Sequence, residues 1–203
     1  MLGFNPDTRR FYDGLMCDTD ENIIKGLVAY LQRHGIGAKD ATQFAEDNYF
    51  RYSSSSHDTE PVDDPKFIMM ELKSHGVKTA VCTSDSRDGN DAMILALGLQ
   101  DVIDFSLCGD DEAMKPKPYP GNIELICSVL GVNVNQSIMV GDSLRDVQMG
   151  KQAGVKASVG VLSGVCDMED FKGVADIVVP SINDVLKIAI PGNSGIKGGM
   201  EQK

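Results

Sequence analysis

The feature that most constrains the fold is an alternation of amphipathic helix and short apolar strand from about residue 63 to residue 190. The apolar runs that we expect to form strands are KTAVCT, IDFSLCG, SIMVG, ASVGV and ADIVVP. The segments with helical periodicity lie near 65–75, 90–97, 120–130, 144–153 and 182–188. Short, continuously apolar strands that alternate with helices are typical of a parallel sheet covered on both faces. The pattern therefore predicts an α/β fold with a doubly wound parallel sheet and right-handed crossovers.

The first 60 residues follow a different pattern. Apolar residues fall on one helical face over 23–31 and again over 40–52, where Phe44 is expected to face inward. The serine run 53–56 and the turn-rich sequence after it separate these two helices from the α/β region. We therefore predict three parts: a two-helix unit without strands over 1–60, an α/β core over 63–190, and a disordered tail over 191–203.

Charge and composition argue against two classes of binding partner, nucleic acids and membranes. Thirty acidic residues against nineteen basic ones give a net charge of −11, which repels nucleic acid and anionic lipid. No apolar run approaches the roughly 18 residues that a membrane span needs. The five cysteines are irregularly spaced without a C-x-x-C pair, as expected of free thiols in a reducing compartment. We expect a cytoplasmic protein with no nucleic-acid or membrane partner, in which a small anionic substrate would need a local cation, a lysine or a helix N-terminus.

Polar residues follow two of the predicted strands, at the sheet edge where ligands bind in open α/β folds. Thr83 and Ser84 come after the first strand, where a hydroxyl and backbone N–H groups can hold a phosphate oxygen or cap the next helix. Asp142 comes after SIMVG, and Asp146 lies about one helical turn later. The two carboxylates suit Mg²⁺; alternatively, Asp142 and Ser143 cap the helix and Asp146 pairs with a nearby base.

The loop sequence AMKPKPYPGN offers a cation for the same sheet edge. Lys115 is flanked by prolines that hold the loop extended, so it can neutralise a phosphoryl group as a point charge. A solvated loop lysine is the alternative interpretation, and we expect Lys117 to be one.

The order of these motifs, Thr-Ser, then K-P-x-P, then V-G-D-S-x-x-D, resembles the haloacid dehalogenase superfamily, most closely its phosphoglycolate phosphatase-like branch. The resemblance covers about residues 12–190. It implies a Rossmann-like core with a helical cap, and Mg²⁺-dependent hydrolysis of a small phosphorylated metabolite through an aspartyl-phosphate. By the same resemblance, Thr83 binds phosphate, Lys115 stabilises nucleophile and phosphoryl group, Asp142 binds magnesium and Asp146 supports it. The residues before 60 correspond to part of the cap.

The chain departs from the family pattern at its first motif, D-x-D-x-T or D-x-D-x-V, whose aspartates are the nucleophile and the acid–base. The only D-x-D is Asp18-Thr19-Asp20, and Asp18 with Glu21 also forms a helix-capping signature. We therefore expect impaired activity and an N-terminally truncated form of a longer phosphatase, in which the missing strand would lie between KTAVCT and SIMVG. The alternative is a non-catalytic phosphate- or protein-binding module. A dehalogenase fits the lysine and the two aspartates less well.

Overall fold

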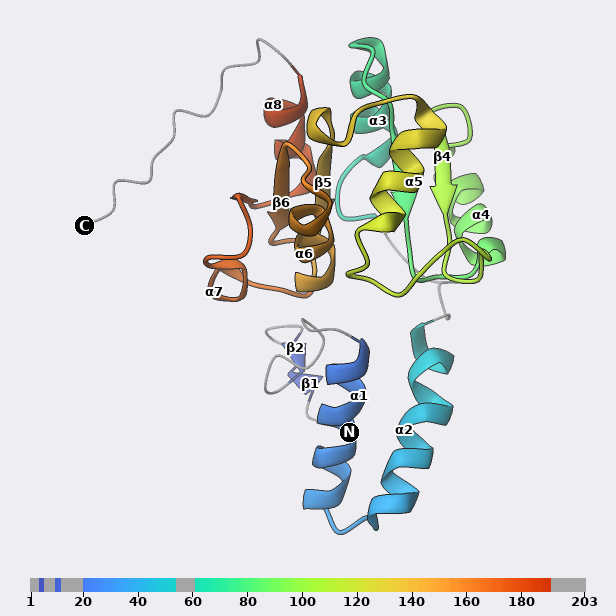
Figure 1. Cartoon of the computed structure of the whole chain (residues 1–203), viewed down its shortest axis with the longest axis vertical. Helices are drawn as coiled ribbons and strands as arrows, with labels where there is room; N and C mark the ends of the chain where they lie inside the picture. Colours follow the sequence, from blue (N-terminus) through green and yellow to red (C-terminus); the bar gives the residue numbers. More distant parts are fainter. Residues whose placement is uncertain (1–3, 6–9, 12–19, 54–60, 191–203) are drawn as a thin grey trace, which may run out of the picture.

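The computed structural model describes residues 4–5, 10–11, 20–53 and 61–190 (Figure 1). The expectations for Asp18 and for the tail over 191–203 fall outside these residues. Within them lie a pair of long helices and an α/β unit. No helix of the described segments combines the length and the apolar character needed to cross a bilayer.

The helix pair consists of α1 (Asp20–Arg33) and α2 (Ala38–Ser53), which lie side by side (Figure 1). Leu27 and Leu31 of α1 are buried against Ala41 and Ala45 of α2. The two helices were predicted, but the inward position of Phe44 was wrong, since its side chain is 46% exposed. The small alanines make the contact instead, because they allow the two helix backbones to approach closely.

Two short strands also lie in this part of the chain, where no strand was expected. β1 (Phe4–Asn5) pairs antiparallel with β2 (Arg10–Phe11). Strands of two residues are too short to show an alternation of apolar and polar positions, so the sequence pattern does not reveal them.

The α/β unit contains the five strands that the apolar runs predicted. They are β3 (Ala80–Cys82), β4 (Phe105–Leu107), β5 (Ile138–Gly141), β6 (Ala157–Val161) and β7 (Ile177–Val179). All of their pairings are parallel, which confirms the α/β class. The described strands form two groups, β3–β4 and β5–β6–β7, and the gap lies where the family pattern places the strand of the first motif. No described strand lies between β3 and β5 to join them by hydrogen bonds.

The helices of this unit follow the predicted segments closely. Their bounds are α3 (Pro65–Ser74), α4 (Arg87–Ala96), α5 (Gly121–Leu130), α6 (Leu144–Ala153), α7 (Met168–Phe171) and α8 (Leu186–Ala189), with 3₁₀ turns at η2 (Val134–Gln136) and η3 (Ile182–Val185). Local sequence explains the helix ends: Asp64 caps α3 and Pro65 occupies its first turn. Gly154 ends α6 in the left-handed conformation. Only the short α7 was not expected.

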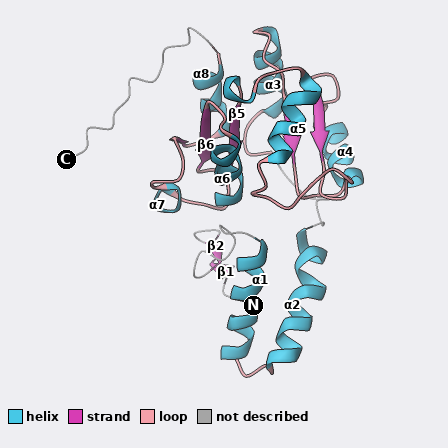
Figure 2. Ribbon diagram, in the orientation of Figure 1, coloured by secondary structure: helices cyan, strands magenta, loops and turns pink. Residues whose placement is uncertain are grey.

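A shared helical layer holds the two sheets together (Figure 2). Ile123 and Cys127 of α5 and Met149 of α6 form one buried cluster. Cys82 of β3 and Met139 of β5 both pack against this cluster. The two sheets therefore meet the same core even though their strands are not hydrogen-bonded to each other.

The strands next to the division are less buried than the strand that has a neighbour on each side. Val159 and Val161 of β6 are buried, whereas all four residues of β5 are partly exposed. On the other side, Ala80 of β3 is exposed. Partial exposure of short apolar strands is the direct result of their unpaired inner edges among the described residues.

Candidate functional site

The candidate site lies where β3 and β5 end, and one lysine connects the two. The ammonium group of Lys117 donates to the carbonyl oxygen of Cys82, the last residue of β3, at 2.7 Å. It also donates to Oδ1 of Asp146, in the first turn of α6, at 2.7 Å. The lysine side chain is only 11% exposed. Lys117 is therefore a largely buried cation at the carboxyl ends of the strands, and the expectation that it is solvated was wrong.

Lys115, the lysine assigned by the sequence, is placed differently. Its side chain is exposed, and its backbone is held by Asn122 of α5. The Asn122 amide accepts from the N–H of Lys115 at 3.1 Å and donates to its carbonyl at 2.8 Å. The motif K-P-x-P occurs twice in the overlapping sequence KPKPYP, starting at Lys115 and again at Lys117. That second occurrence makes Lys117 a second candidate for the same role.

Asp146 pairs with a base, as the alternative to Mg²⁺ binding expected, and it also takes part in capping its own helix. Its Oδ2 accepts from the Ser143 N–H at 3.3 Å and from the Ser143 hydroxyl at 2.7 Å, while the Ser143 hydroxyl accepts from the Asp146 N–H. This reciprocal capping box begins α6. With Oδ1 bonded to Lys117, both carboxylate oxygens already have donors.

Asp142 follows β5 directly and is held by the loop that follows β6. Its Oδ2 accepts from the Val165 N–H at 3.1 Å, and its backbone carbonyl accepts from the Cys166 N–H at 3.0 Å. Burial raises the pKa of Asp142 above its ordinary value, and the negative charge of nearby Asp146 raises it further. The charged form of Asp142 is therefore disfavoured at this position, and a cation placed beside the carboxylate would stabilise it.

Thr83 and Ser84 lie in the loop between β3 and α4. The Thr83 backbone N–H donates to Leu107 of β4 at 3.0 Å, and its hydroxyl accepts from the Asp85 N–H at 3.1 Å. Neither residue caps α4, because that role belongs to Ser86, whose hydroxyl accepts from the Gly89 N–H. The Ser84 side chain is exposed. The loop therefore presents hydroxyl and N–H groups one residue beyond the Lys117 contact.

The fit of these residues to Mg²⁺ rests on Asp142. Magnesium in proteins is held by one or two carboxylates, with water or phosphate completing the shell. Asp142 meets that minimum, whereas Asp146 is already engaged by Lys117 and Ser143. No cluster of three or more His, Cys, Asp or Glu side chains suited to a metal occurs in the described part of the chain. Asp20 is the first residue of α1, but its side chain is outside the description, as is all of Asp18.

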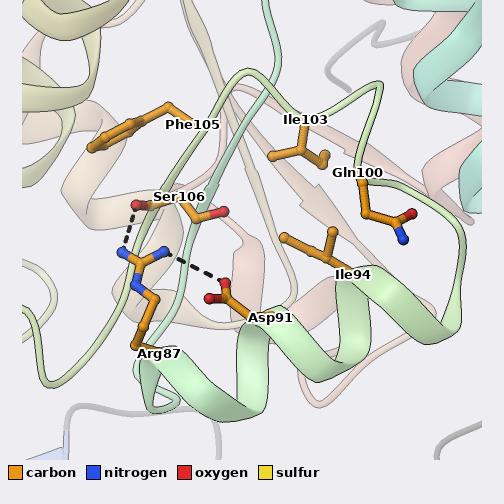
Figure 3. A pocket seen from close by; sticks show the side chains of 7 residues that line it. All are labelled: Arg87, Asp91, Ile94, Gln100, Ile103, Phe105 and Ser106. Atoms are coloured by element: carbon orange, nitrogen blue, oxygen red, sulfur yellow. Dashed lines mark hydrogen bonds and ion pairs between the residues drawn. The ribbon is translucent and has the colours of Figure 1, made fainter.

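A separate cavity of about 300 Å³ lies between α4 and β4 (Figure 3). Its lining residues are Arg87, Asp91, Ile94, Gln100, Ile103, Phe105 and Ser106. The Arg87 guanidinium donates to the Ser106 carbonyl of β4 at 2.9 Å and forms ion pairs with Asp91 and Asp111. Because these partners occupy the guanidinium, and because no sequence-predicted site residue lines this cavity, we do not assign the site to it.

Comparison with known proteins identifies the family to which the chain is similar. The family model described as "Haloacid dehalogenase-like hydrolase" matches residues 37–160. Pyrophosphatase PpaX of Halalkalibacterium halodurans is 32% identical over 69% of this chain and 66% of its own length. Phosphoglycolate phosphatase of Rhodospirillum rubrum is 31% identical over 54% of this chain and 49% of its own length. The chain thus spans between about half and two thirds of these two curated relatives.

A solved structure shows the same fold. The crystal structure of a predicted phosphoglycolate phosphatase from Haemophilus somnus superposes with a TM-score of 0.68 at 20% identity. The superposition covers 86% of this chain and 80% of that one. At 20% identity, this similarity shows only that the two chains share a fold.

Proposed function

Because the chain belongs to the haloacid dehalogenase-like hydrolase family, we propose that it acts on small phosphomonoesters, in the manner of a phosphoglycolate phosphatase. The observation that carries this proposal is the buried Lys117 ammonium between the end of β3 and the first turn of α6. A fixed cation at the carboxyl ends of parallel strands attracts a phosphoryl group locally, despite the net charge of −11.

Each residue of the site has a proposed part in binding the phosphoryl group. Lys117, in place of Lys115, offsets negative charge on the phosphoryl oxygens. Thr83 and the backbone N–H groups after it donate to a phosphate oxygen. Asp142 is the residue that would hold Mg²⁺, which when bound supplies further positive charge to the phosphate. Asp146 keeps the Lys117 ammonium in position through the 2.7 Å contact.

The nucleophile is proposed from the family rather than from the described residues. In the family an aspartate attacks phosphorus, and water then cleaves the aspartyl-phosphate. The candidates in this chain remain Asp18 as nucleophile and Asp20 as acid–base. One observation favours the alternative of a non-catalytic phosphate-binding module. Of the described carboxylates at the site, Asp146 is bonded to Lys117 and Asp142 to the Val165 N–H.

Two measurements on the full chain test these proposals. Release of phosphate from a panel containing phosphoglycolate, pyrophosphate and sugar phosphates, with and without Mg²⁺, is expected to show turnover that depends on Mg²⁺ and is impaired by the departure at the first motif. Lys117→Met is expected to abolish this turnover and Lys115→Met to leave it intact. Turnover that survives Lys117→Met would overturn the site assignment, and turnover without any divalent cation would overturn the role of magnesium.

Binding of inorganic phosphate separates the two functions. If the wild-type chain binds phosphate through Lys117 but turns over no member of the panel, the non-catalytic module is the correct interpretation. Loss of turnover in Asp18→Asn, with phosphate binding retained, would instead identify Asp18 as the nucleophile. If turnover is unchanged in Asp18→Asn, that role for Asp18 is wrong.

A further inference from the structure

We propose that Gly164 is a positioning residue for Asp142: because residue 164 has no side chain, the loop after β6 lies against the Asp142 carboxylate and fixes its orientation. The proposal rests on the proposed function, in which Asp142 is the residue that would hold Mg²⁺. Neither the sequence motifs nor the family comparison assigns a role to Gly164.

There is no room for a side chain at Gly164, because the Asp142 side chain lies directly against it. A Cβ atom built on Gly164 would lie 2.0 Å from Oδ2, 2.2 Å from Cβ and 2.4 Å from Cγ of Asp142. Any side chain at this position would therefore overlap the carboxylate itself. The backbone of Gly164 is not in the left-handed region, so the requirement for glycine comes from this close approach and not from its φ angle.

Two hydrogen bonds from the same loop hold Asp142 and fix the orientation of its carboxylate. The next residue, Val165, donates its N–H to Asp142 Oδ2 at 3.1 Å. The Cys166 N–H donates to the Asp142 backbone carbonyl at 3.0 Å. Gly164 thus allows two consecutive N–H groups to bond the same aspartate, one to its side chain and one to its main chain.

The loop cannot easily move away from a larger residue at position 164, because it is fixed at both ends. At its start, the Leu162 N–H donates to Val179 of β7 at 3.0 Å. At its end, Cys166 is 3% exposed in a buried cluster with Val147 of α6 and Phe171 of α7. A methyl group at position 164 would therefore displace the Asp142 carboxylate, and a displaced ligand weakens a metal site.

The first test is binding of Mg²⁺ alone, measured by titration calorimetry on the full chain. Gly164→Ala is expected to weaken Mg²⁺ binding by at least about tenfold, as changes to residues that orient metal ligands do. The matched control is Gly37→Ala, since a Cβ at Gly37 has only one near neighbour, an Asp40 oxygen at 3.7 Å. The control is expected to bind like wild type. Equal Mg²⁺ affinity in Gly164→Ala and wild type would overturn the proposal.

The second test needs no metal and uses a double-mutant cycle with Asp142→Gly, which removes all three atoms that a Cβ at position 164 would meet. Hydrogen exchange of the Val165 amide is expected to accelerate by at least about tenfold in Gly164→Ala. In the Asp142→Gly background, Gly164→Ala is expected to add nothing. A further acceleration there would mean that Gly164 acts on the loop alone, and the proposal would fail.

Two outcomes distinguish a failure of this proposal from a failure of the proposed function. If wild type and Asp142→Asn both fail to bind Mg²⁺, the magnesium site is wrong, and the exchange cycle still decides whether Gly164 orients Asp142. If Gly164→Ala does not fold, folding of the Gly164→Ala and Asp142→Gly double variant at the level of Asp142→Gly would support the proposal. Failure of that double variant to fold would contradict it.

Discussion

The Lys117 ammonium lies 2.7 Å from Oδ1 of Asp146, and both side chains are largely shielded from solvent. Removing one partner of such a pair leaves a buried charge without compensation, which costs more than losing an exposed ion pair. The same ammonium bonds the last carbonyl of β3, so the pair also connects the two sheets.

Lys117→Met is therefore expected to lower the free energy of unfolding by about 3 kcal/mol, the magnitude typical of breaking a buried pair. Urea denaturation measures this difference. The matched control is Lys115→Met, two residues away, where the exposed side chain should leave stability within about 0.5 kcal/mol of wild type. Equal losses in the two variants would contradict the placement of Lys117.

Asp104 gives a prediction for acid stability. The pKa of Asp104 is held below its ordinary value, chiefly because the Thr79 N–H donates to the carboxylate at 2.8 Å. A carboxylate with a lowered native pKa stabilises the fold above its ordinary pKa, and this contribution is lost as the pH falls through the native value. Asp104→Asn should cost about 1 kcal/mol at neutral pH, with the difference from wild type shrinking below about pH 4.

Urea denaturation across pH checks this, with Glu169→Gln as the control. Glu169 pairs with Lys172 on the surface, where both side chains are over 70% exposed (79% and 73%). Such a pair contributes little, so the control should follow wild type at every pH. A constant difference between Asp104→Asn and wild type down to about pH 2 would be inconsistent with the lowered pKa.

Thr83 gives a prediction for phosphate binding. Thr83→Val removes the hydroxyl that accepts from the Asp85 N–H, and with it the turn that begins the loop. Binding of inorganic phosphate should weaken by roughly tenfold, the equivalent of about 1.4 kcal/mol, or one hydrogen bond. Thr83→Ser keeps the hydroxyl and should bind nearly as wild type does. Calorimetric titration distinguishes the two variants, and undiminished binding in Thr83→Val would exclude the hydroxyl from the site.

Gly160 of β6 gives a prediction for packing. A Cβ at this position would lie 2.8 to 2.9 Å from three ring atoms of Phe171, which is completely buried. Gly160→Ala should therefore destabilise the fold by about 1–3 kcal/mol through overpacking. Combining it with Phe171→Leu should cost less than the sum of the single changes, because the smaller side chain relieves the overlap. Thermal unfolding of the four proteins measures this, and strict additivity would argue against the contact.

Local signals explain why most of the fold could be predicted from the sequence. Helix α6 has the predicted bounds because Ser143 and Gly154, which cap its ends, are marked in the sequence itself. Phe44 was misplaced for a different reason. Whether its side chain is buried depends on how closely α1 and α2 approach each other, and the periodicity of the sequence does not encode that distance. The gap between β3 and β5, in contrast, lies where the strand of the family's first motif was expected to be missing.

The structure overturns one expectation about the candidate site, the solvated Lys117, and the roles of the other proposed residues stay predictions. The sequence placed Thr83 and Asp142 at strand ends because they directly follow apolar runs, and it placed Asp146 about one helical turn after Asp142. It could not choose between the two overlapping lysine motifs, since the choice depends on Asn122, which is 1% exposed and fixes the backbone of Lys115. Gly164 carries no local signal at all, because its importance lies in a neighbour 22 positions earlier in the chain, Asp142.

The division between β3 and β5 has a consequence for cooperativity. In a continuous sheet, separating two halves breaks a ladder of backbone hydrogen bonds, but no such ladder crosses this boundary in the described residues. What resists separation there is side-chain packing against α5 and α6 and between α3 and the segment after β7, together with Lys117. Within the described residues, β3–β4 can therefore separate from β5–β6–β7 without breaking a ladder of backbone hydrogen bonds.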